Sequence, residues 1–445
     1  MQRIVVEPHP GYQAALDYMY SFINYEDKMP SSAEHVQLNH ARMLWLLREL
    51  DQPQEKYPSV VIAGTKGKGS TAAMIESILR AAGKRTGFYS SPHLHSWRER
   101  IQINRELIPQ AQVVRLMDRL RELVERLPAD LGPPTTFEIA TGIALRYFAE
   151  QQVDVAVLEI GLGGRNDSVN VVTPRVSVIT PISYDHVAVL GPTLTDIAGA
   201  KAGIIKSGVP VIFGPQEPEA LAVIQREAGV DAPLWQAEVG GIRRLQDGGD
   251  EYQDYPIPVT PDAIALRGPH QAENARLAVG AVMLFDAQEL RVEARAFEVG
   301  LRSVQWPARF EVVEGRPTVV IDGAMNAASA VRLRAALATI PHERLVLILG
   351  TSRDKDLRAL AAELVPEASA VLVTRSRHPR SAGTEALAAA VEPFLRGPLI
   401  ITDDIPPALA KAREIAGPND LICVAGSLFV AAAAREALGL AEVID

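Results

Sequence analysis

The sequence lacks most features of secreted and membrane-embedded proteins. It has one cysteine in 445 residues, so no disulfide can form within the chain. No apolar run reaches the roughly 18 residues that a membrane-spanning helix needs. No basic stretch followed by an apolar core opens the chain, so no signal peptide is expected. These absences predict a cytoplasmic protein that does not enter a membrane.

An excess of positive charge is also lacking. Lys and Arg number 45 against 54 Asp and Glu, and this net charge of −9 argues against a general nucleic-acid-binding protein. Internal repeats and long low-complexity segments are absent as well. Hydrophobic residues make up 47% and charged residues 22%, which is typical of a globular protein. The sole cysteine, Cys423, lies in the apolar run LICVAG and is expected in the core, not as a nucleophile.

Short β-like runs alternate with helical patterns in the first two thirds of the chain. The runs predicted to form buried strands are 60–64, 155–161, 176–180 and 209–214. Helical patterns cover 72–83, 137–150 and 273–285. This alternation predicts a parallel α/β sheet. Residues 230–268 are turn-rich instead and predict hairpins or an irregular insertion.

A second α/β series begins near residue 317. Its predicted strands are 318–323, 345–350, 370–375, 398–403 and 421–426, and its predicted helices include 329–340 and 428–440. We therefore predict an α/β protein with two domains and a boundary near Gln305–Pro307. Residues 1–305 would form a P-loop parallel-sheet ATPase domain, and residues 306–445 a smaller α/β domain.

Residues 57–83 carry the strongest chemical signal. A strand-like run is followed by the glycine-rich turn Gly64–Ser70 and a helical pattern. Glycines let backbone N–H groups approach phosphate oxygens, and the start of a helix adds partial positive charge. Lys68 can reach the terminal phosphates, and a hydroxyl of Ser70 or Thr71 can meet phosphate or Mg²⁺. A bare glycine turn can also be structural, but these side chains favour nucleotide binding.

Three further segments place polar side chains after predicted strands or on a short helix. Glu159 ends a strand, where a carboxylate can bind Mg²⁺, cap a helix or pair with a cation. Asp185 and His186 are candidates for metal ligation or for a general base, and a structural role for the histidine stays open. Lys201 and Lys206 are predicted on a short helix before a strand, where the simplest alternative makes both solvent-exposed.

These segments, in this order, resemble the folylpolyglutamate synthase/dihydrofolate synthase family of the Mur ligase superfamily, which are ATP-dependent amide ligases. The resemblance runs from about residue 35 to the C-terminus. The segments that carry it are GTKGKGS (64–70), SSPHLHSWRERIQIN (90–104), TTFEIAT (135–141), EIGLGGRND (159–167), DHVAVLG (185–191), KAGIIKSGVP (201–210), GPHQAENA (268–275), WPARFE (306–311), DGAMN (322–326), DKD (354–356), HPRSA (378–382) and GSL (426–428).

The resemblance implies a full set of site residues. The implied nucleotide contacts are Gly64, Thr65, Gly67, Lys68, Gly69, Ser70, Thr71, Asn274, Arg309 and Asp322. The implied Mg²⁺ ligands are Ser91, Glu159, His186 and a carbamate formed by Lys201 with CO₂. The implied pterin pocket is lined by Thr135, Thr136, Phe137, Glu138, Asn166, Asp167 and Ser168. Catalytic roles fall on Lys68, Lys201 and His186, and carbamylation requires that the charge of Lys201 be suppressed.

The resemblance also implies a reaction. The carboxylate of a folate or dihydropteroate would attack the γ-phosphate of ATP with Mg²⁺ present, and L-glutamate would then displace phosphate from the acyl phosphate. The cofactors would be ATP and Mg²⁺, and the substrates small molecules of folate and one-carbon metabolism. No nucleic-acid or membrane partner is implied, and the family precedent is a monomer.

Several positions depart from the family pattern. Met325 replaces a histidine in DGAHN, Ala200 replaces an acidic residue before Lys201, and Lys66 replaces an asparagine and either adds charge near the phosphates or points to water. Asn166, Ser168 and Val169 alter a stretch usually written RLDATN. Two alternatives therefore stay open: a Mur-ligase-like enzyme for a non-pterin carboxylate, and an ATP-binding paralogue without catalysis, which Met325 and Ala200 favour. Arg380 is a candidate for glutamate recognition.

Overall fold

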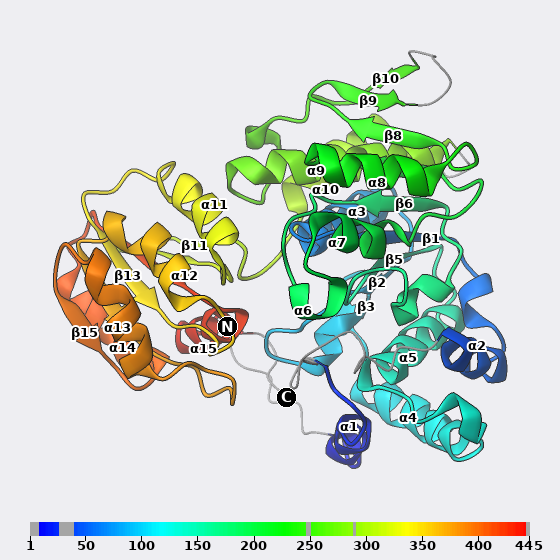
Figure 1. Ribbon diagram of the computed structural model, residues 1–445, viewed down its shortest axis with the longest axis horizontal. Helices are drawn as coiled ribbons and strands as arrows, with labels where there is room; N and C mark the ends of the chain where they lie inside the picture. The colour runs from blue at the N-terminus through cyan, green and yellow to red at the C-terminus, as the bar shows by residue number, and fades with distance from the viewer. Residues whose placement is uncertain (1–8, 26–39, 246–250, 288–290, 442–445) are drawn as a thin grey trace. The chain divides into compact units, whose positions relative to one another are not determined.

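The structure is a computed structural model that describes residues 9–25, 40–245, 251–287 and 291–441. The chain forms two compact units, each with its own sheet (Figure 1). The first unit extends to His93 and resumes over Trp97–Ile264 and Glu273–Val304. The second unit consists of Gln305–Asp445 together with the short segments Leu94–Ser96 and Ala265–Ala272, which no sequence pattern indicated.

The first unit is built on a ten-stranded sheet with the order β10-β9-β8-β7-β6-β1-β5-β2-β3-β4. Its parallel strands are β1 (Ser59–Ala63), β2 (Thr86–Tyr89), β5 (Val155–Glu159), β6 (Val176–Ile179), β7 (Val211–Phe213) and β8 (Leu234–Ala237). All five residues of β1 are buried, as a central parallel strand covered on both faces requires. The chain crosses from β5 to β6 around β1, so the loop after β1 lies at a switch point, where α/β sheets bind ligands.

Antiparallel strands extend this sheet at both ends. They are β3 (Ile101–Ile103) and β4 (Glu106–Leu107) at one end, and β9 (Gly241–Arg244) and β10 (Tyr252–Asp254) at the other. The prediction of hairpins within residues 230–268 is therefore confirmed.

Helices cover both faces of the first sheet. One apolar cluster joins alternate strand residues such as Val61 and Leu158 to α1 (Tyr12–Tyr20), α2 (His40–Glu49), α4 (Gln110–Glu125), α5 (Thr136–Glu150), α7 (Leu194–Ala202) and α8 (Pro218–Ala228). The intervening residues of β1 face the opposite side, because side chains alternate along a strand. On that side α3 (Lys68–Ala81) packs against α10 (Ala294–Ser303), with Ser77 donating to the Gly300 carbonyl at 2.8 Å. The remaining helices of the unit are α6 (Val187–Leu190) and most of α9 (Pro269–Asp286).

The second unit has a six-stranded sheet with the order β11-β12-β16-β13-β14-β15. The strands are β11 (Glu311–Val313), β12 (Thr318–Ile321), β13 (Leu345–Leu349), β14 (Ala370–Val373), β15 (Leu399–Ile401) and β16 (Leu421–Ala425), all parallel except β11. One face packs against α11 (Ala327–Leu337), α12 (Leu357–Leu364) and α13 (Thr384–Val391), and the other against α14 (Ile405–Ile415) and α15 (Leu428–Ala437). Cys423 is fully buried in β16, as predicted, and burial raises the pKa of its thiol.

The segment Leu94–Ser96 is attached to the rest of the second unit through polar contacts of the buried His95 side chain. Arg435 of α15 donates from its NH1 to His95 Nε2 at 2.7 Å, and His95 Nδ1 bonds Glu436 Oε1 at 3.1 Å. Arg435 also pairs with Glu311 at 2.9 Å. The His95 side chain is 3% exposed. His95 therefore packs as part of the second unit, although it lies more than 200 residues before Gln305 in the sequence.

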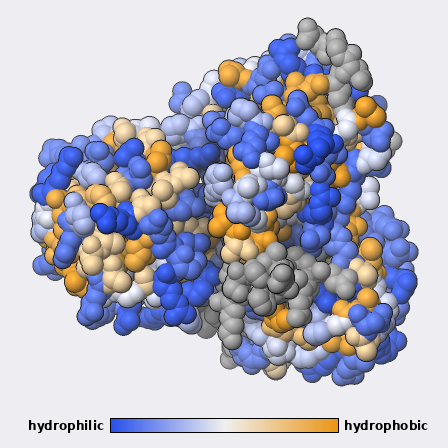
Figure 2. All heavy atoms as spheres, viewed as in Figure 1, coloured by the Kyte–Doolittle hydropathy of each residue, from blue (hydrophilic) through white to orange (hydrophobic). Residues whose placement is uncertain are grey.

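Polar residues cover much of the visible face of each unit, with apolar residues scattered between them (Figure 2). Within the described ranges, no helix is both long and apolar enough to cross a membrane.

A buried ion pair connects α2 to the start of α5. Nε and NH2 of Arg42 donate to the two carboxylate oxygens of Glu138 over 2.9 to 3.1 Å, and NH1 donates to the Leu131 carbonyl at 2.8 Å. The two charged side chains are 3% and 1% exposed. Removing one partner of such a pair leaves the other charge buried and uncompensated.

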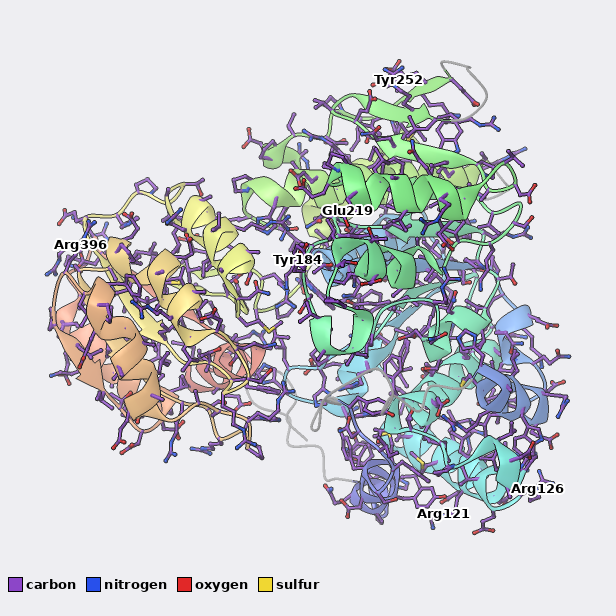
Figure 3. The ribbon with its side chains drawn as sticks, viewed as in Figure 1. Arg121, Arg126, Tyr184, Glu219, Tyr252 and Arg396 are labelled. Atoms are coloured by element: carbon purple, nitrogen blue, oxygen red, sulfur yellow. The ribbon has the colours of Figure 1, made fainter. Side chains whose placement is uncertain are left out.

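Arg42→Ala is therefore expected to lower the free energy of unfolding by about 3–5 kcal/mol, measured by urea denaturation. The matched control is Arg126→Ala. Arg126 is labelled in Figure 3, its side chain is 58% exposed, and its pair with Glu49 spans 3.4 Å. Exposed pairs contribute less than about 1 kcal/mol. Equal losses in the two variants would contradict this account.

Candidate active site

The glycine-rich turn after β1 fits closely between its neighbours. Gly64 has φ 140° and Gly67 has φ 90°, a region that favours glycine. A Cβ atom on Gly64 would lie 1.9 Å from Thr180 Oγ1, and one on Gly67 would lie 2.3 Å from Asn274 Oδ1. The turn is thus packed against the end of β6 and against α9, and it brings the predicted nucleotide contacts Gly67 and Asn274 together.

Two side chains of the turn attach it to the segment after β6. Thr65 Oγ1 donates to the Ser183 carbonyl and accepts from the Ser183 N–H, both at 3.0 Å. Lys66 Nζ lies 3.2 Å from Asp185 Oδ2. Lys66 thus has a carboxylate partner, so it does not simply point to water. The hydroxyl of Thr65, a predicted nucleotide contact, is used within the protein.

The start of α3 presents the groups expected for phosphate binding. Lys68 is the first residue of the helix, and the backbone N–H groups of Lys68, Gly69 and Ser70 have no partner within the helix. The Thr71 N–H donates to the Gly67 carbonyl at 2.9 Å. Thr71 is fully buried, and its hydroxyl has no hydrogen-bond partner among the residues that the structure describes. Buried hydroxyls are rarely unpaired. The arrangement fits a phosphate oxygen or a hydrated Mg²⁺ at this position.

Lys201 lies beneath the turn and is 3% exposed, so the alternative of a solvent-exposed lysine is wrong for this residue. Its Nζ donates to the Gly64 carbonyl at 2.8 Å. Burial, reinforced by the charge of Lys68, lowers the pKa of Lys201 to about 7. A substantial fraction of the amine is therefore neutral near pH 7, as carbamylation requires.

Lys206, by contrast, lies beyond the end of α7, so its predicted place on that helix is wrong. It donates to the Asn170 carbonyl at 3.0 Å.

The predicted metal ligands Ser91 and Glu159 meet after neighbouring strands. The Ser91 N–H donates to Glu159 Oε2 at 3.4 Å, and Glu159 is 5% exposed. Glu159 lies opposite Ile62 of β1, two residues before Gly64. A hydroxyl and a carboxylate are hard oxygen donors that suit Mg²⁺. In the part of the chain that the structure describes, no group of three His, Cys, Asp or Glu side chains gathers as a metal site.

His186, the third predicted ligand, precedes α6 and lies beside Asp185. Its Nε2 is 3.8 Å from Asp185 Oδ1, and its φ is 51°. Burial opposes ionisation of Asp185, but Lys66, His186 and Lys201 together lower its pKa to about 2. Asp185 is thus ionised at neutral pH, and it links His186 to the glycine-rich turn through Lys66.

The predicted pterin residues fall into two segments that contact each other. At the start of α5, Thr135 and Glu138 form a capping box, and Thr136 Oγ1 donates to the Met19 carbonyl at 3.1 Å. The Phe137 ring packs on Gly161, where a Cβ atom would lie 2.6 Å from Cζ of Phe137. The hydrogen-bonding groups of Thr135, Thr136 and Glu138 are therefore engaged inside the protein, and the ring of Phe137 faces the turn at Gly161.

The second segment contains Asn166, Asp167 and Ser168. Asn166 is exposed, whereas Ser168 Oγ lies 3.2 Å from Thr141 Oγ1 of α5. Asp167 accepts from the N–H groups of Gly161, Leu162 and Val169 over 2.9 to 3.1 Å. Burial outweighs these donors and the nearby Lys68, and raises the pKa of Asp167 to about 6.

Arg309 and Asp322, the remaining predicted nucleotide contacts, lie together in the second unit. Asp322 accepts from the N–H groups of Phe310 and Ala324, both at 2.7 Å. Burial raises the pKa of Asp322, and Arg309 opposes this change. Arg309 NH1 lies 2.6 Å from the position of a Cβ atom on Gly323. Asp322 therefore orders the chain on which Arg309 is presented.

His270 is a candidate site residue that the sequence reasoning missed. It lies at the start of α9, and its Nδ1 is buried with no partner among the described residues. Burial, together with Arg332 and Arg309, lowers the pKa of His270 to about 4. The imidazole is therefore neutral beside a predicted nucleotide contact. Its place in the segment GPHQAENA, at a helix start, was the available signal.

At two positions that depart from the family pattern, Met325 and Ala200, backbone groups form local hydrogen bonds. The Met325 N–H donates to Ser329 Oγ at 3.0 Å, and Asn326 caps α11, so this turn closes without the usual histidine. The Ala200 carbonyl accepts from the Arg165 N–H at 2.7 Å. An acidic side chain is missing at position 200, but Lys201 still reaches the turn.

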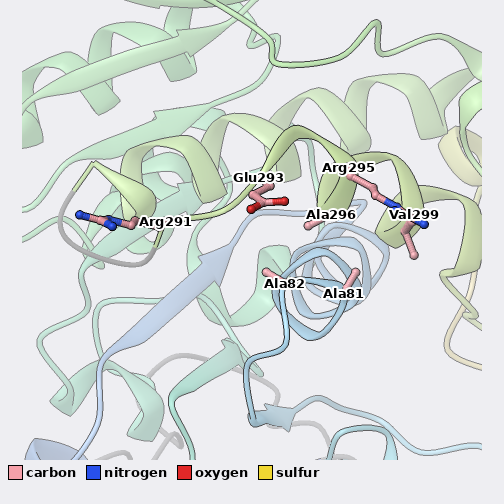
Figure 4. Close-up of a pocket in the computed structure, with 7 residues that line it drawn as sticks. All are labelled: Ala81, Ala82, Arg291, Glu293, Arg295, Ala296 and Val299. Carbon is pink, nitrogen blue, oxygen red and sulfur yellow. The ribbon is translucent and has the colours of Figure 1, made fainter.

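A cavity of about 330 Å³ lies between α3 and α10, lined by Ala81, Ala82, Arg291, Glu293, Arg295, Ala296 and Val299 (Figure 4). Ala81 and Ala82 are at the C-terminal end of α3, about 20 Å along the helix from Lys68. The cavity is therefore separate from the candidate active site.

Comparison with known proteins agrees with this geometry. The model described as Mur ligase middle domain matches residues 62–282, and the model described as Mur ligase, glutamate ligase domain matches residues 308–428. The two units therefore place the protein in the class of Mur ligases.

Named relatives narrow the class. The folylpolyglutamate synthase of Lacticaseibacillus casei is 36% identical, over 90% of this chain and 94% of the relative. The dihydrofolate synthase/folylpolyglutamate synthase of Mycobacterium tuberculosis is 37% identical, over 89% of each chain. The chain belongs to the folylpolyglutamate synthase family, as the sequence predicted. It spans about half the length of two haloarchaeal relatives, each a probable bifunctional folylpolyglutamate synthase/dihydropteroate synthase.

Solved structures support the same fold. The Mycobacterium tuberculosis folylpolyglutamate synthase complexed with ADP has a TM-score of 0.81 and 33% identity, over 97% of this chain and 99% of that one. The Escherichia coli protein in complex with DHPP and ADP has a TM-score of 0.77, at 29% identity over 96% and 97%. The predicted two-domain α/β fold class is confirmed.

Gly67→Ala is expected to weaken ATP binding by at least about tenfold, because the new methyl group would displace Asn274 and open the turn. Gly83→Ala is the matched control. Gly83 has φ 78°, and a Cβ atom there would meet nothing within 4 Å. Both variants place an alanine at a positive φ, which costs about 1–2 kcal/mol, but only Gly67→Ala also brings a Cβ atom against Asn274. Calorimetric ATP titration of both proteins checks this, and equal affinities would contradict it.

The free energy of unfolding is expected to depend on pH through Lys201. Its pKa is about 7 in the folded protein and about 10.4 in an unfolded chain. Between these values the unfolded chain binds more protons, so stability rises with pH by up to ~1.4 kcal/mol per unit, and below pH 7 the full penalty of the buried charge remains. Urea unfolding of wild type and Lys201→Met at pH 7, 8 and 9, without nucleotide or metal, isolates the effect. A constant difference between the two proteins would contradict the lowered pKa.

Proposed function

We propose that the protein is an ATP-dependent amide ligase that joins L-glutamate to the carboxylate of a folate or dihydropteroate and releases ADP and phosphate. The observation that carries this proposal is the buried Lys201 amine, bonded to the carbonyl of Gly64 within a phosphate-binding turn. The names of the relatives and their complexes with ADP support it. The haloarchaeal relatives are about twice as long as the matched region. The ligase activity alone is therefore proposed here, and not the second activity in their names.

In the first step, an oxygen of the acceptor carboxylate forms a bond to the γ-phosphorus of ATP, and the bond to the β,γ-bridging oxygen breaks. The N–H groups at the start of α3 and the ammonium of Lys68 would offset the charge on the phosphate oxygens. Thr71, whose buried hydroxyl has no partner among the described residues, would supply a further donor or ligand. The products are ADP and an acyl phosphate.

In the second step, the neutral amine of L-glutamate attacks the acyl carbon. A tetrahedral intermediate forms, the bond to the phosphate oxygen breaks, and the amine loses a proton. Asn274, which lies against the glycine-rich turn, would contact the nucleotide there. Arg309 stays a predicted nucleotide contact, on a chain that Asp322 orders. Exclusion of water matters because the acyl phosphate would otherwise hydrolyse.

Ser91, Glu159, His186 and the carbamate of Lys201 would hold Mg²⁺. When bound, the ion would neutralise charge on the transferring phosphoryl group. Glu159 and the hydroxyl of Ser91 are oxygen donors of the kind that suits Mg²⁺, and the Ser91 backbone N–H contacts the Glu159 carboxylate. Lys201 fits it because its lowered pKa leaves a neutral amine for CO₂, and the carbamate converts a cation into an anionic oxygen ligand.

The acceptor would bind between the start of α5 and the turn at Gly161, where Phe137 offers an aromatic face. Asn166 and Ser168 differ from the usual family residues, and this difference favours a second candidate function, ligation of an amino acid to a non-pterin carboxylate. A non-catalytic paralogue fits less well, because Lys68, Thr71, Glu159 and Lys201 are all in place. We infer small-molecule substrates, no nucleic-acid or membrane partner, a monomer and a cytoplasmic location.

With Mg²⁺ and L-glutamate present, release of ADP is expected to depend on dihydropteroate or a folate, because the acid is the nucleophile of the first step. A coupled assay across pterin and non-pterin carboxylates separates the two candidates. Turnover with non-pterin acids alone would replace the first candidate by the second, and no orthophosphate with any acid would overturn both.

Lys201→Ala is expected to lower kcat by at least about 100-fold, because it removes a predicted metal ligand. Lys206→Ala is the control, since this half-buried lysine of the same segment bonds only the Asn170 carbonyl in the described contacts. Wild-type turnover by the Lys201 variant would refute the carbamate role.

A further inference from the structure

Lys66 lies in the glycine-rich turn at a position where the family pattern has asparagine. It stands between Gly64 and Lys68 in the sequence GTKGKGS, and no step of the proposed reaction uses it. Its side chain is 17% exposed, and its Nζ lies 3.2 Å from Asp185 Oδ2. Lysine side chains are mostly exposed to water. An ammonium that is partly buried at a phosphate-binding turn therefore calls for a functional explanation.

The first half of the turn has its other polar groups engaged with the segment after β6. The N–H groups of Thr65 and Lys66 donate to the Pro181 carbonyl at 3.1 and 3.4 Å. The Thr65 hydroxyl bonds the backbone of Ser183, the residue before Tyr184, which is labelled in Figure 3. The backbone at residues 65 and 66 is thus fastened in place. A contribution from this half of the turn to phosphate binding has to come from the Lys66 side chain.

The Lys66 ammonium acts on the same small region as the other two lysines of the site. Burial lowers the pKa of Lys201 to about 7, and the charges of Lys68 and Lys66 add to this effect. Asp185 is within electrostatic range of both Lys66 and Lys201. Since Lys201 Nζ bonds the Gly64 carbonyl at 2.8 Å, this region lies directly at the turn.

Two departures from the family pattern change the charge of the site in the same direction. Lys66 adds a positive charge where the pattern has a neutral asparagine. Ala200 removes a negative charge next to Lys201. Together they make the site more positive by the charge of one Mg²⁺ ion. A site of this kind suits a triphosphate whose own charge is less fully neutralised by metal.

The contact between Lys66 and Asp185 can be exchanged for one with a phosphate. Both side chains are partly exposed, at 17% and 20%, and pairs that water reaches contribute little to stability. A triphosphate carries several negative charges, and charge-assisted hydrogen bonds to phosphate are strong. The flexible four-carbon stem of a lysine allows its ammonium to change partner while the backbone stays fixed.

We propose that Lys66 binds the phosphates of ATP and supplies part of the positive charge that Mg²⁺ otherwise supplies. In the free protein, Asp185 holds the ammonium beside the turn. This chain therefore binds ATP more tightly in the absence of metal than it would with the asparagine of the family pattern. The inference rests on the nucleotide-binding part of the proposed function and adds a residue that the family pattern does not contain.

The test compares ATP binding by the full-length wild type and Lys66→Asn, measured by calorimetric titration in EDTA and again with Mg²⁺. In EDTA the Kd of the variant is expected to rise about 10- to 30-fold, because a charge-assisted contact is lost. With Mg²⁺ the rise is expected to stay below about threefold, because the ion supplies the missing charge. Equal Kd values in EDTA, or the same loss under both conditions, would overturn the proposal.

Lys56→Asn is the matched control. Lys56 precedes β1 as Lys66 follows it, and its side chain is 41% exposed and paired with the exposed Asp51. This variant removes the same charge from the protein but not from the turn. Its Kd for ATP in EDTA is expected to stay within about twofold of wild type, because salt screens distant exposed charges. A loss as large as that of Lys66→Asn would assign the effect to net charge and overturn the role of the turn.

AMP identifies the phosphates involved. It lacks the β- and γ-phosphates, so Lys66→Asn is expected to leave its Kd in EDTA within about twofold of wild type. Equal weakening of AMP and ATP would contradict a contact with the terminal phosphates.

Asp185→Asn tests the exchange of partners. Without the carboxylate, the Lys66 ammonium no longer has to leave an anion, so ATP is expected to bind about 3- to 10-fold more tightly in EDTA. In the Lys66→Asn background the same change is expected to lose most of this gain. An equal gain in both backgrounds would show that the two side chains act independently, against the proposal.

The Tm separates a binding role from a structural one. Because Lys66→Asn breaks only a partly exposed pair, its Tm is expected to stay within about 2 °C of wild type. A fall of about 5 °C or more with an unchanged Kd for ATP in EDTA would make Lys66 a structural residue and reject its role in phosphate binding.

These measurements need no turnover, so they are separate from the test of the proposed function. If wild type binds ATP but joins L-glutamate to no acid, the ligase activity is wrong, and the comparison in EDTA still decides the role of Lys66. If wild type binds ATP only when Mg²⁺ is present, the ligase activity is untouched and this inference is wrong.

Discussion

The hydrogen bond from the Lys201 amine to the carbonyl of Gly64 is the contact on which the site depends. It places a buried basic nitrogen directly under the phosphate-binding turn, and burial together with Lys68 lowers its pKa. The turn can approach this closely only because Gly64 carries no side chain where Thr180 stands. Chemistry and backbone geometry therefore constrain each other: a larger residue at position 64 would move the carbonyl that Lys201 binds.

Much of the fold could be predicted because its signals are local. The strand, glycine turn and helix around Lys68 follow from residues that are adjacent in sequence, and the buried strands of both sheets are continuous apolar runs. For the same reason, Glu159 could be placed at the end of a predicted strand and His186 after another. The family resemblance then supplied the roles, which local patterns alone left open.

What the sequence did not reveal depends on partners far apart in the chain. Lys66 pairs with Asp185, which follows five further strands along the chain, so the direction of the Lys66 side chain could not be read from the turn itself. Thr135 and Glu138 were predicted to line a pocket, but they also cap α5, and Glu138 pairs with Arg42. The burial of Lys201 likewise results from packing, because the composition of its helix fits an exposed lysine equally well.

The interleaving of the two units has a consequence for how the protein can be dissected. His95 is hydrogen-bonded to Arg435 and Glu436. A fragment that begins at Gln305 would therefore lack the segment Leu94–Ser96 and leave these two side chains without their His95 contact. Separating the halves by a single cleavage therefore does not yield two natural folding modules. A recombinant form of the smaller unit would need residues 94–96 and 265–272 joined to residues 305–445 by linkers.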